Sequence, residues 1–317
     1  MSSGSVIQTA FILGAGLGTR LRPLTDELPK PLVPICQKPL ITFALDHLID
    51  IGVEKFFINT HRFPEKFSEA FPTGRYAGKT LHFINEPILL ETGGGIRNIE
   101  RELRDEPFIT YSGDVLTDAP LQPLLDAHFE RGNDVTLALR KTGLSSEIAL
   151  RDGRIVDISN RYGVAGEFDF ANVAVWNPSI FGRIPSKQKI SFIPVLRDWI
   201  GDGGKIGGVV IETGKWFNLG SRAEYFEVHR TIFAGWCPDY IKDSDWAAPV
   251  HSSALVDRSV RLRGCSVIGK DCRVGADVLL EDAILWSGAQ IASNAQLIRC
   301  IVRARKTVTG SHRNIDI

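Results

Sequence analysis

The sequence has no excess charge of either sign and contains little cysteine. Its 317 residues include 37 Lys and Arg and 37 Asp and Glu, so the formal net charge is zero. A nucleic-acid surface or a polybasic membrane patch needs an excess of positive charge, so we expect neither partner. The five cysteines are scattered without a Cys-x-x-Cys pair and predict neither disulfides nor a zinc site. They are Cys36, Cys237, Cys265, Cys272 and Cys300.

Long apolar runs are also missing. No stretch approaches the roughly 20 apolar residues that span a bilayer, and the N-terminus lacks the basic start and long apolar core of a signal peptide. We therefore expect a cytoplasmic protein without a membrane partner. At 317 residues, the chain is long enough for one large core and a second, smaller domain.

Residues 13–40 combine three glycines, an arginine and a proline-framed lysine in a short loop that follows an apolar run. Glycines let the backbone approach a ligand and turn its N–H groups inward, and Arg20 and Lys30 add fixed positive charge. This composition predicts a loop that holds a triphosphate. The alternative, a plain glycine turn, would require neither the arginine nor the Pro-Lys-Pro sequence.

Two other glycine-rich phosphate motifs fit this loop poorly. A Walker A loop has Lys and Ser or Thr directly after its last glycine, whereas Gly18 is followed by Thr19 and Arg20. The dinucleotide fingerprint Gly-x-Gly-x-x-Gly needs an acidic residue about 20 positions further on. Here the third glycine comes one residue early, and positions 37–39 read Gln-Lys-Pro.

The pattern up to about residue 140 alternates short apolar strands with amphipathic segments, which is typical of a parallel sheet with crossover helices. The following strand-rich part is assigned to the same domain. We predict an α/β fold with a doubly wound, Rossmann-like mixed sheet over residues 1–240, closed by a helix over Ser221–Phe233 that opens with a capping box. The other predicted strands are Ile7–Leu13, Lys55–Asn59, Leu81–Ile84, Pro107–Tyr111, Asp134–Leu139, Glu147–Leu150, Arg154–Ile158, Asp169–Trp176 and Lys205–Ile211, and the helices are Leu40–Ile51, Pro64–Phe71, Gly95–Leu103 and Leu121–Arg131.

The tail from Val250 onward has an apolar residue at every sixth position. Such repeats with intervening glycines are typical of a left-handed parallel β-helix, which we predict for residues 246–317. A few coils bury little core, so this tail should pack on the larger domain or on another subunit, which leaves a homo-oligomer open. The series is Val250, Val256, Leu262, Ile268, Val274, Leu280 and Trp286, followed after a one-residue slip by Ile291 and Leu297.

Residues 13–40 resemble the signature of sugar-1-phosphate nucleotidyltransferases, Gly-x-Gly-x-Arg-Leu-x-Pro-Leu-Thr followed by Pro-Lys-Pro. The resemblance extends over essentially the whole chain, with similarity to mannose-1-phosphate guanylyltransferases and to muramate-recycling uridylyltransferases. It implies that an NTP and a sugar 1-phosphate react to give an NDP-sugar and pyrophosphate, with Mg²⁺ as cofactor. A nucleophilic Ser or Cys is not expected, because such transfer depends on positioning and charge neutralisation.

The resemblance also assigns the nucleotide site. Arg20 and the loop amides would hold the leaving β- and γ-phosphates, and Lys30 would lie near the α-phosphate unless it is an ordinary solvated lysine. Glu86, in the segment that resembles the family's base-contacting segment, would accept from the paired N–H donors of a guanine edge, or else be solvated. The expected nucleotide-binding residues are Leu13, Gly14, Ala15, Gly16, Gly18, Thr19, Glu86, Thr92, Gly93, Gly94 and Gly113.

Asp114 and Asn218 are the expected metal ligands. Asp114 follows a predicted buried strand, at the sheet edge where the glycine loop also begins, and matches the Asp of the family's metal-binding Gly-Asp pair. Its alternative role is to cap the next helix, for which Asp118 is better placed. Asn218 stands where the family writes Trp-x-Asp, so its amide oxygen keeps a ligand atom but brings no charge. Arg20, Lys30 and Asp114 are the expected catalytic residues.

The acceptor side departs further from the family pattern. The family's Glu-Lys-Pro motif falls near Asn160 and Arg161, and Asn172 replaces the glycine of the next strand. These three residues are expected to hold the sugar phosphate, with Arg161 in place of the missing lysine. Two rival functions stay open: a non-catalytic regulatory homologue that binds an NDP-sugar, and nucleotidyl transfer to a non-sugar acceptor such as a phosphonate or phosphocholine. Retention of the triphosphate and metal residues favours an enzyme.

Overall fold

The computed structural model describes residues 7–103 and 105–317, so the first six residues of the predicted larger domain lie outside the described residues. The chain forms two compact units. The first contains Met1–Leu17 and Phe43–Trp216, and the second contains Gly18–Thr42 and Phe217–Ile317. The glycine-rich loop is therefore divided between the two units after Leu17. Within the described ranges, no helix is both long and apolar enough to cross a membrane.

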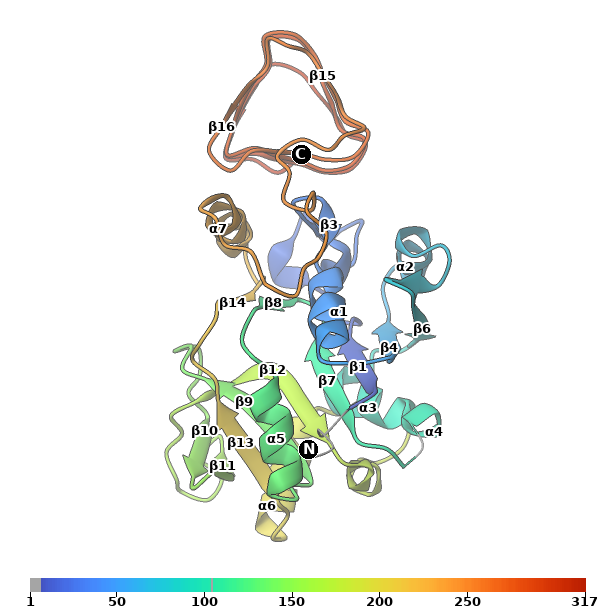
Figure 1. The fold of residues 1–317 in the computed structure, drawn as a ribbon, viewed down its shortest axis with the longest axis vertical. Coiled ribbons are helices and arrows are strands. Elements are labelled where there is room, and N and C mark those ends of the chain that lie inside the picture. Colours follow the sequence, from blue (N-terminus) through green and yellow to red (C-terminus); the bar gives the residue numbers. More distant parts are fainter. Residues whose placement is uncertain (1–6, 104) are drawn as a thin grey trace. The chain divides into compact units, whose positions relative to one another are not determined.

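The first unit is built on one ten-stranded sheet in the order β10-β11-β13-β9-β12-β7-β1-β4-β6-β5 (Figure 1). Strands β7, β1, β4 and β6 are parallel, and β12 is antiparallel to both β7 and β9. The predicted doubly wound mixed sheet is confirmed. Its strands are β1 (Thr9–Leu13), β4 (Lys55–Thr60), β5 (Arg75–Tyr76), β6 (Lys79–Asn85), β7 (Phe108–Ser112), β9 (Val135–Arg140), β10 (Ile148–Arg151), β11 (Arg154–Ile158), β12 (Asp169–Trp176) and β13 (Ile206–Val210); β8 is Val115–Thr117.

Helices cover this sheet because its central strands are apolar on both faces. In β1, Ala10, Phe11 and Ile12 are fully buried, as expected for a parallel strand with helices on either side. Helix α6 was not predicted; it begins after Ser191, whose Oγ accepts the Ile193 N–H at 3.2 Å. The helices are α1 (Ile41–Asp50), α2 (Pro64–Ala70), α3 (Glu91–Asn98), α4 (Glu100–Leu103), α5 (Gln122–Glu130) and α6 (Phe192–Gly201), with the 3₁₀ helix η3 (Pro178–Gly182).

Two local predictions need correction: the bounds of one helix and the cap of another. The helix predicted over Gly95–Leu103 begins earlier, as α3, and is interrupted at Ile99 before α4. Asp118 does not cap α5, because that helix begins at Gln122 with Leu121 at its N-cap and has no side-chain cap. The Asp118 carboxylate instead accepts the backbone N–H of Lys215 at 2.5 Å.

The second unit combines the loop over residues 18–42 with α7 and the tail. Helix α7 (Arg222–Phe233) begins after Ser221, whose Oγ accepts the Glu224 N–H at 3.2 Å. The Glu224 carboxylate accepts the N–H of Gly220 at 2.8 Å, so the predicted capping box is present with its return bond shifted by one residue. The loop contains η1 (Thr19–Leu21), η2 (Lys30–Leu32), β2 (Pro34–Ile35) and β3 (Lys38–Pro39), and β14 (Trp216–Asn218) precedes α7.

The tail is a parallel β-helix whose coils form three parallel sheets (Figure 1), as predicted. Paired residues are 18 apart between the first coils, as in Leu255 and Arg273, and 17 apart between the next, as in Arg273 and Gln290. The sheets are β15 (Leu255–Val256), β18 (Arg273–Val274), β21 (Gln290–Ile291) and β24 (Thr307–Val308); β16 (Arg261–Arg263), β19 (Leu279–Glu281), β22 (Gln296–Ile298) and β25 (Ser311–Arg313); and β17 (Val267–Ile268), β20 (Ile284–Leu285) and β23 (Ile301–Val302).

The one-residue slip in the six-residue repeat occurs one repeat earlier than predicted, between Leu280 and Leu285. Leu285 follows Leu280 in the interior of the β-helix. Trp286 is directed towards α7 instead, and its Nε1–H donates to the hydroxyl of Tyr225 at 3.1 Å. Leu262 is 37% exposed rather than interior. In a 17-residue coil, one of the three sides is a residue shorter than in an 18-residue coil. Because Leu285 and Trp286 are adjacent and both apolar, the sequence does not show which side is shorter.

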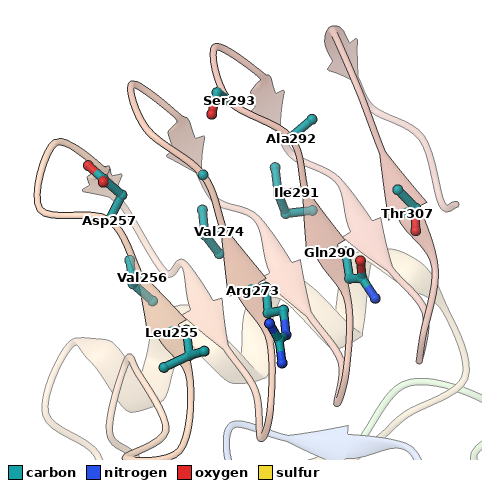
Figure 2. Close-up of a pocket in the computed structure, with 11 residues that line it drawn as sticks. Leu255, Val256, Asp257, Arg273, Val274, Gln290, Ile291, Ala292, Ser293 and Thr307 are labelled. Atoms are coloured by element: carbon teal, nitrogen blue, oxygen red, sulfur yellow. The ribbon is translucent and has the colours of Figure 1, made fainter.

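The outer face of the β15-β18-β21-β24 sheet carries a hollow of about 620 Å³. Figure 2 shows Leu255, Arg273, Gln290 and Thr307 along successive strands of this face. None of the predicted site residues lines it.

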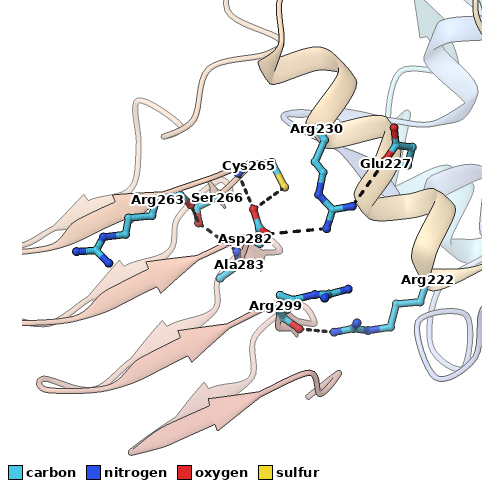
Figure 3. A network of polar contacts seen from close by, with 9 residues as sticks. All are labelled: Arg222, Glu227, Arg230, Arg263, Cys265, Ser266, Asp282, Ala283 and Arg299. Carbon is cyan, nitrogen blue, oxygen red and sulfur yellow. Dashed lines mark hydrogen bonds and ion pairs between the residues drawn. The ribbon is translucent and has the colours of Figure 1, made fainter.

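Helix α7 contacts the β-helix through charged side chains (Figure 3). Arg222 donates to the backbone O of Arg299 and, from Nε, to Asp316 Oδ1 at 2.7 Å. Arg230 lies 3.9 Å from Asp282, whose other carboxylate oxygen accepts the Cys265 N–H at 3.0 Å. Together with the bond from Trp286 to Tyr225, these contacts fix α7 on the coils within the second unit.

Candidate functional site

Gly14 and Gly16, in the part of the glycine-rich loop that belongs to the first unit, have different roles. A Cβ at Gly14 would lie 2.7 Å from the backbone O of Asn59, and the Gly14 N–H donates to Asn59 Oδ1 at 2.7 Å. Packing therefore requires Gly14, and its N–H is already used inside the fold. A Cβ at Gly16 would meet none of the described atoms within 4 Å. The exposed backbone at Gly16 is thus the part of this segment that is open to a ligand.

Asn59 and Glu86 form a buried pair next to this loop. Asn59 lies beside Leu13 in the β1 to β4 register, and its Nδ2 donates to Glu86 Oε1 at 2.8 Å. Glu86 Oε2 accepts the Leu90 N–H at 3.0 Å, and Glu86 is only 1% exposed, so the solvated alternative for this residue is wrong. Asn59 was not among the predicted site residues, although an amide at the carboxyl end of a central parallel strand is a usable signal.

The glycines of α3 are explained by close packing within the first unit. A Cβ at Gly93 would lie 2.9 Å from the backbone O of Ile190, and one at Gly94 would overlap the backbone O of Gln188. The Gly94 N–H donates to Ile190 O at 3.0 Å, and Thr92 Oγ1 accepts the Phe192 N–H at 3.2 Å. These residues join α3 to the segment that leads into α6. Approach of a nucleotide is therefore not needed to explain the glycine run.

The carboxyl ends of β1 and β7 meet, as the sequence predicted. The Gly113 N–H donates to the backbone O of Leu13 at 2.9 Å, so the half-buried Asp114 directly follows a residue that is bonded to the start of the glycine loop. Ala15, in that loop, is buried. This edge of the sheet brings together Leu13, Gly113 and Asp114 from segments about 100 residues apart.

Asn172 lies beside this edge and Asn160 and Arg161 lie in a separate turn. Asn172 has φ 66° at an irregularity of β12, and its Oδ1 accepts the Ser112 Oγ–H at 3.3 Å. The turn at Asn160 and Arg161 is exposed, and the Arg161 N–H donates to Asp157 Oδ1 at 2.7 Å. Burial would raise the pKa of Asp157, but the backbone N–H groups that it accepts hold the pKa below its usual value.

In the second unit, Gly18 and Arg20 begin the other half of the loop. Gly18 has φ 62°, a conformation that favours glycine, and its backbone O accepts the Thr25 Oγ–H at 2.8 Å. Thr19 and Arg20 are exposed on η1. A Cβ at Gly220 would lie only 3.3 Å from Arg20 Cζ, so glycine there lets the backbone pack closely against the guanidinium.

Lys30 lies against the second predicted metal ligand, within the same unit. It is 6% exposed, so the alternative of an ordinary solvated lysine is wrong. Its Nζ donates to Asn218 Oδ1 at 3.5 Å, a long hydrogen bond. The segment Asn218–Gly220 therefore lies beside both predicted phosphate-binding cations: Lys30 bonds to the amide, and Arg20 leaves little room for a side chain at Gly220.

A protein-only metal cage is absent from the described residues. Within 7–103 and 105–317, no three His, Cys, Asp or Glu side chains come together as a metal site. A divalent cation at Asp114 would need most of its oxygen ligands from elsewhere, and triphosphate oxygens and water are the usual source for Mg²⁺.

The chain is similar in sequence to known proteins. Residues 9–149 match the family described as Nucleotidyl transferase. The mannose-1-phosphate guanylyltransferase of Mycobacterium tuberculosis is 28% identical over 301 residues, 92% of this chain and 83% of that protein. The N-acetylmuramate alpha-1-phosphate uridylyltransferase of Neisseria meningitidis serogroup B is 31% identical over 216 residues, 67% of this chain and 93% of that protein.

The fold has a solved counterpart. The crystal structure of a UDP-glucose pyrophosphorylase complexed with UDP-glucose superposes with a TM-score of 0.62 at 20% identity, over 73% of this chain and all of that one. The fold agreement, the family match and the similarity along most of the uridylyltransferase point the same way as the glycine loop and its two cations. The chain belongs to the sugar-1-phosphate nucleotidyltransferase family.

Proposed function

We propose that the protein transfers a nucleotidyl group from an NTP to a sugar 1-phosphate, giving an NDP-sugar and pyrophosphate. The observation that carries this proposal is the position of Asn218–Gly220 beside both Lys30, which is bonded to Asn218, and Arg20, which leaves little room for a side chain at Gly220. That arrangement places two cations on one loop whose backbone is exposed at Gly16. The similarity to named mannose-1-phosphate guanylyltransferases makes GTP and mannose 1-phosphate the first pair to test.

The proposed reaction is an in-line displacement at the α-phosphorus. An oxygen of the sugar phosphate forms the new bond to phosphorus while the bond to the α–β bridging oxygen breaks, and that oxygen leaves with pyrophosphate. Arg20 and the amides near Gly16 and Gly18 neutralise and hold the leaving phosphates, and Lys30 holds the α-phosphate. Because no covalent intermediate is involved, the protein acts by positioning and charge neutralisation.

Mg²⁺ is the proposed cofactor, and Asp114 is the residue that fits it best. Asp114 offers a charged carboxylate just beyond the carboxyl end of β7, whereas Asn218 offers a neutral amide oxygen. Once bound, the cation would neutralise phosphate charge. We infer that Asp114 holds it together with triphosphate oxygens, and that Asn218 contributes less than the aspartate of the family pattern.

The proposed base site is the segment from Glu86 through Thr92 to Gly94. Burial of Glu86 and its two bonds support a positioning role: its carboxylate fixes Asn59, which in turn holds Gly14, and it fixes the N–H of Leu90. A carboxylate can accept more hydrogen bonds than these two, so Glu86 favours a guanine base, whose edge offers paired N–H donors. Thr92, Gly93 and Gly94 would then form a rigid wall, because α3 packs tightly on residues 188–192.

The acceptor phosphate is assigned to Asn160, Arg161 and Asn172. The contact between Asn172 and Ser112 supports this for Asn172, because Ser112 is two residues from Asp114. The exposed guanidinium of Arg161 supplies the positive charge that a phosphate needs.

We further propose that residues 1–240 form the catalytic domain and that residues 246–317 form a β-helix domain. The proposed location is the cytoplasm, and assembly into a homo-oligomer stays open.

A matrix of NTPs against sugar 1-phosphates, phosphocholine and a phosphonate, scored by pyrophosphate release with Mg²⁺, tests this function. Release should require both an NTP and one phosphorylated acceptor. Release from an NTP alone would indicate a pyrophosphohydrolase instead. Binding of an NDP-sugar without turnover of any pair would favour the regulatory homologue, for which the loss of a carboxylate at Asn218 is the supporting observation.

A further inference from the structure

The loop over residues 18–42 is tied to the last full coil of the β-helix within the second unit. Arg303 donates from Nη1 to the backbone O of Pro23 at 3.4 Å and to Glu27 Oε1 at 3.2 Å. Lys306 donates to the same Glu27 oxygen at 3.3 Å. One arginine thus bridges two points of the loop, and a lysine on the same coil reinforces it.

Arg303 is held on its own side as well. Its backbone N–H donates to the backbone O of Ile317 at 2.8 Å, and its Nε donates to the same oxygen at 3.2 Å. Its side chain is 16% exposed, whereas that of Glu27 is 58% exposed. An exposed ion pair adds little to the stability of a fold, so this pair matters for the position of the loop rather than for overall stability.

The rest of the loop is held by other residues. The Tyr225 hydroxyl donates to the backbone O of Pro34 at 2.6 Å, and His229 Nε2 accepts the Cys36 N–H at 3.1 Å. Both side chains come from α7 and are fully buried. Loss of the Arg303 contacts would therefore loosen the part of the loop before residue 33 while α7 still holds the part after it.

The segment tied by Arg303 is the one that carries the two phosphate-binding cations. Pro23 and Glu27 lie between Arg20 and Lys30 in the sequence. The pair also compensates the negative charge of Glu27, which would otherwise repel a triphosphate bound by its neighbours. No direct contact of the tail with a substrate is needed for this effect.

We propose that Arg303 is a positioning residue for nucleotidyl transfer: through Pro23 and Glu27 it holds Arg20 and Lys30 where they bind the triphosphate. This inference rests on the proposed function. It gives the β-helix a part in the reaction that is distinct from assembly or solubility.

Steady-state kinetics of the full chain test the proposal. Arg303→Ala should raise the KM for the NTP on the order of tenfold, with the KM for the acceptor unchanged, because only the triphosphate side is loosened. Arg303→Lys should recover part of the loss, since its ammonium can still pair with Glu27. Arg305→Ala, which removes an exposed arginine two residues further along the same coil, is the matched control and should behave as wild type.

Hydrogen exchange separates positioning from a general loss of stability, and it does not depend on turnover. Arg303→Ala should speed amide exchange in residues 18–32 and leave residues 33–42 unchanged. An unchanged NTP KM together with unchanged exchange would overturn the proposal, as would faster exchange throughout the second unit with a lowered Tm. If wild type transfers no nucleotidyl group, the proposed function fails, whereas exchange and calorimetric NTP affinity of the same variants still decide whether Arg303 positions the loop.

Discussion

Lys30 donates to the amide oxygen of Asn218 at 3.5 Å within the second unit. The family pattern has an aspartate in place of Asn218, and a carboxylate at this distance would form an ion pair with the ammonium group. The amide forms a hydrogen bond but brings no charge, so this contact orients Lys30 without neutralising it. The same substitution removes a negative ligand from the proposed metal site. In the proposed site, asparagine at position 218 would therefore strengthen binding of the α-phosphate by Lys30 and weaken binding of the cation.

The first prediction concerns the metal. Asn218→Asp should lower the Mg²⁺ concentration that gives half-maximal rate, because a second carboxylate would help to balance the two charges of the cation. Asp114→Asn should nearly abolish turnover. Initial rates over a Mg²⁺ titration measure both effects. An unchanged Mg²⁺ dependence in Asn218→Asp, beside an inactive Asp114→Asn, would show that residue 218 is not a ligand.

The second prediction concerns the phosphate-binding cations. Arg20→Ala and Lys30→Ala should each lower kcat/KM on the order of a hundredfold or more, the scale of a lost transition-state contact. Arg22→Ala is the control, because Arg22 is exposed and pairs with Asp26 at 3.4 Å. Its kcat/KM should stay near that of wild type. Wild-type rates in both Arg20→Ala and Lys30→Ala would contradict the proposed function.

The third prediction uses the close packing of Gly220 on Arg20. A Cβ at Gly220 would lie 3.3 Å from Arg20 Cζ and 3.2 Å from Glu224 Oε2, so both side-chain ends must move slightly. Because flexible ends can yield, Gly220→Ala should fold normally but lower kcat/KM by displacing the guanidinium. Gly182→Ala, where a Cβ would meet no described atom within 4 Å, is the control. Equal kinetics for the two variants would show that the position of Arg20 does not depend on Gly220.

Local sequence patterns predicted those parts of the fold that depend on neighbouring residues. The glycine loop after β1, the capping box at Ser221 and the stacked coils of the tail all follow from short-range spacing. The contacts of the site depend instead on residues far apart in the chain. Asn59 holds Gly14 across 45 residues, and Lys30 meets Asn218 across 188. A single sequence can mark a residue such as Asn59 by its place at a strand end, but it does not show which residue the side chain will meet.

Side-chain packing explains the remaining errors. The glycines of α3 suggested close approach of a nucleotide, yet Gly93 and Gly94 are already required by the backbone of residues 188–192. Similarly, Leu285 and Trp286 are adjacent and both apolar, so periodicity could not tell which one faces the interior of the β-helix. In each case the sequence fits two different arrangements, and only the three-dimensional structure distinguishes them.

The fourth prediction concerns acceptor choice. Asn172 has φ 66°, which glycine adopts without strain, so Asn172→Gly should fold while removing the amide that accepts from Ser112. The unfolding free energy should change by less than about 1.5 kcal/mol, the scale of one hydrogen bond. The KM for the sugar phosphate should change several-fold while that for the NTP stays constant. Asn294→Gly, at φ 64° in the β-helix, is the matched control and should change neither KM. An unchanged acceptor KM in Asn172→Gly would remove Asn172 from the proposed acceptor site.

The last prediction concerns stability in acid. Burial lowers the pKa of His229 to about 4, although its hydrogen bond to the backbone of Tyr225 acts in the opposite direction. The folded state therefore keeps this ring neutral, with Nε2 accepting the Cys36 N–H at 3.1 Å.

In the unfolded chain a histidine takes up a proton near pH 6.5, so His229 should reduce the free energy of unfolding as the pH falls from about 6.5 to about 4. His47 and His128, whose pKa values are also lowered by burial, contribute to the same loss. Urea unfolding across this range should show a shallower decline for His229→Gln, because the glutamine oxygen can accept the same N–H without titrating. Replacement of the exposed His82 by Gln should leave the decline as in wild type. A decline in His229→Gln as steep as that of wild type would mean that His229 is protonated equally in the folded and unfolded states.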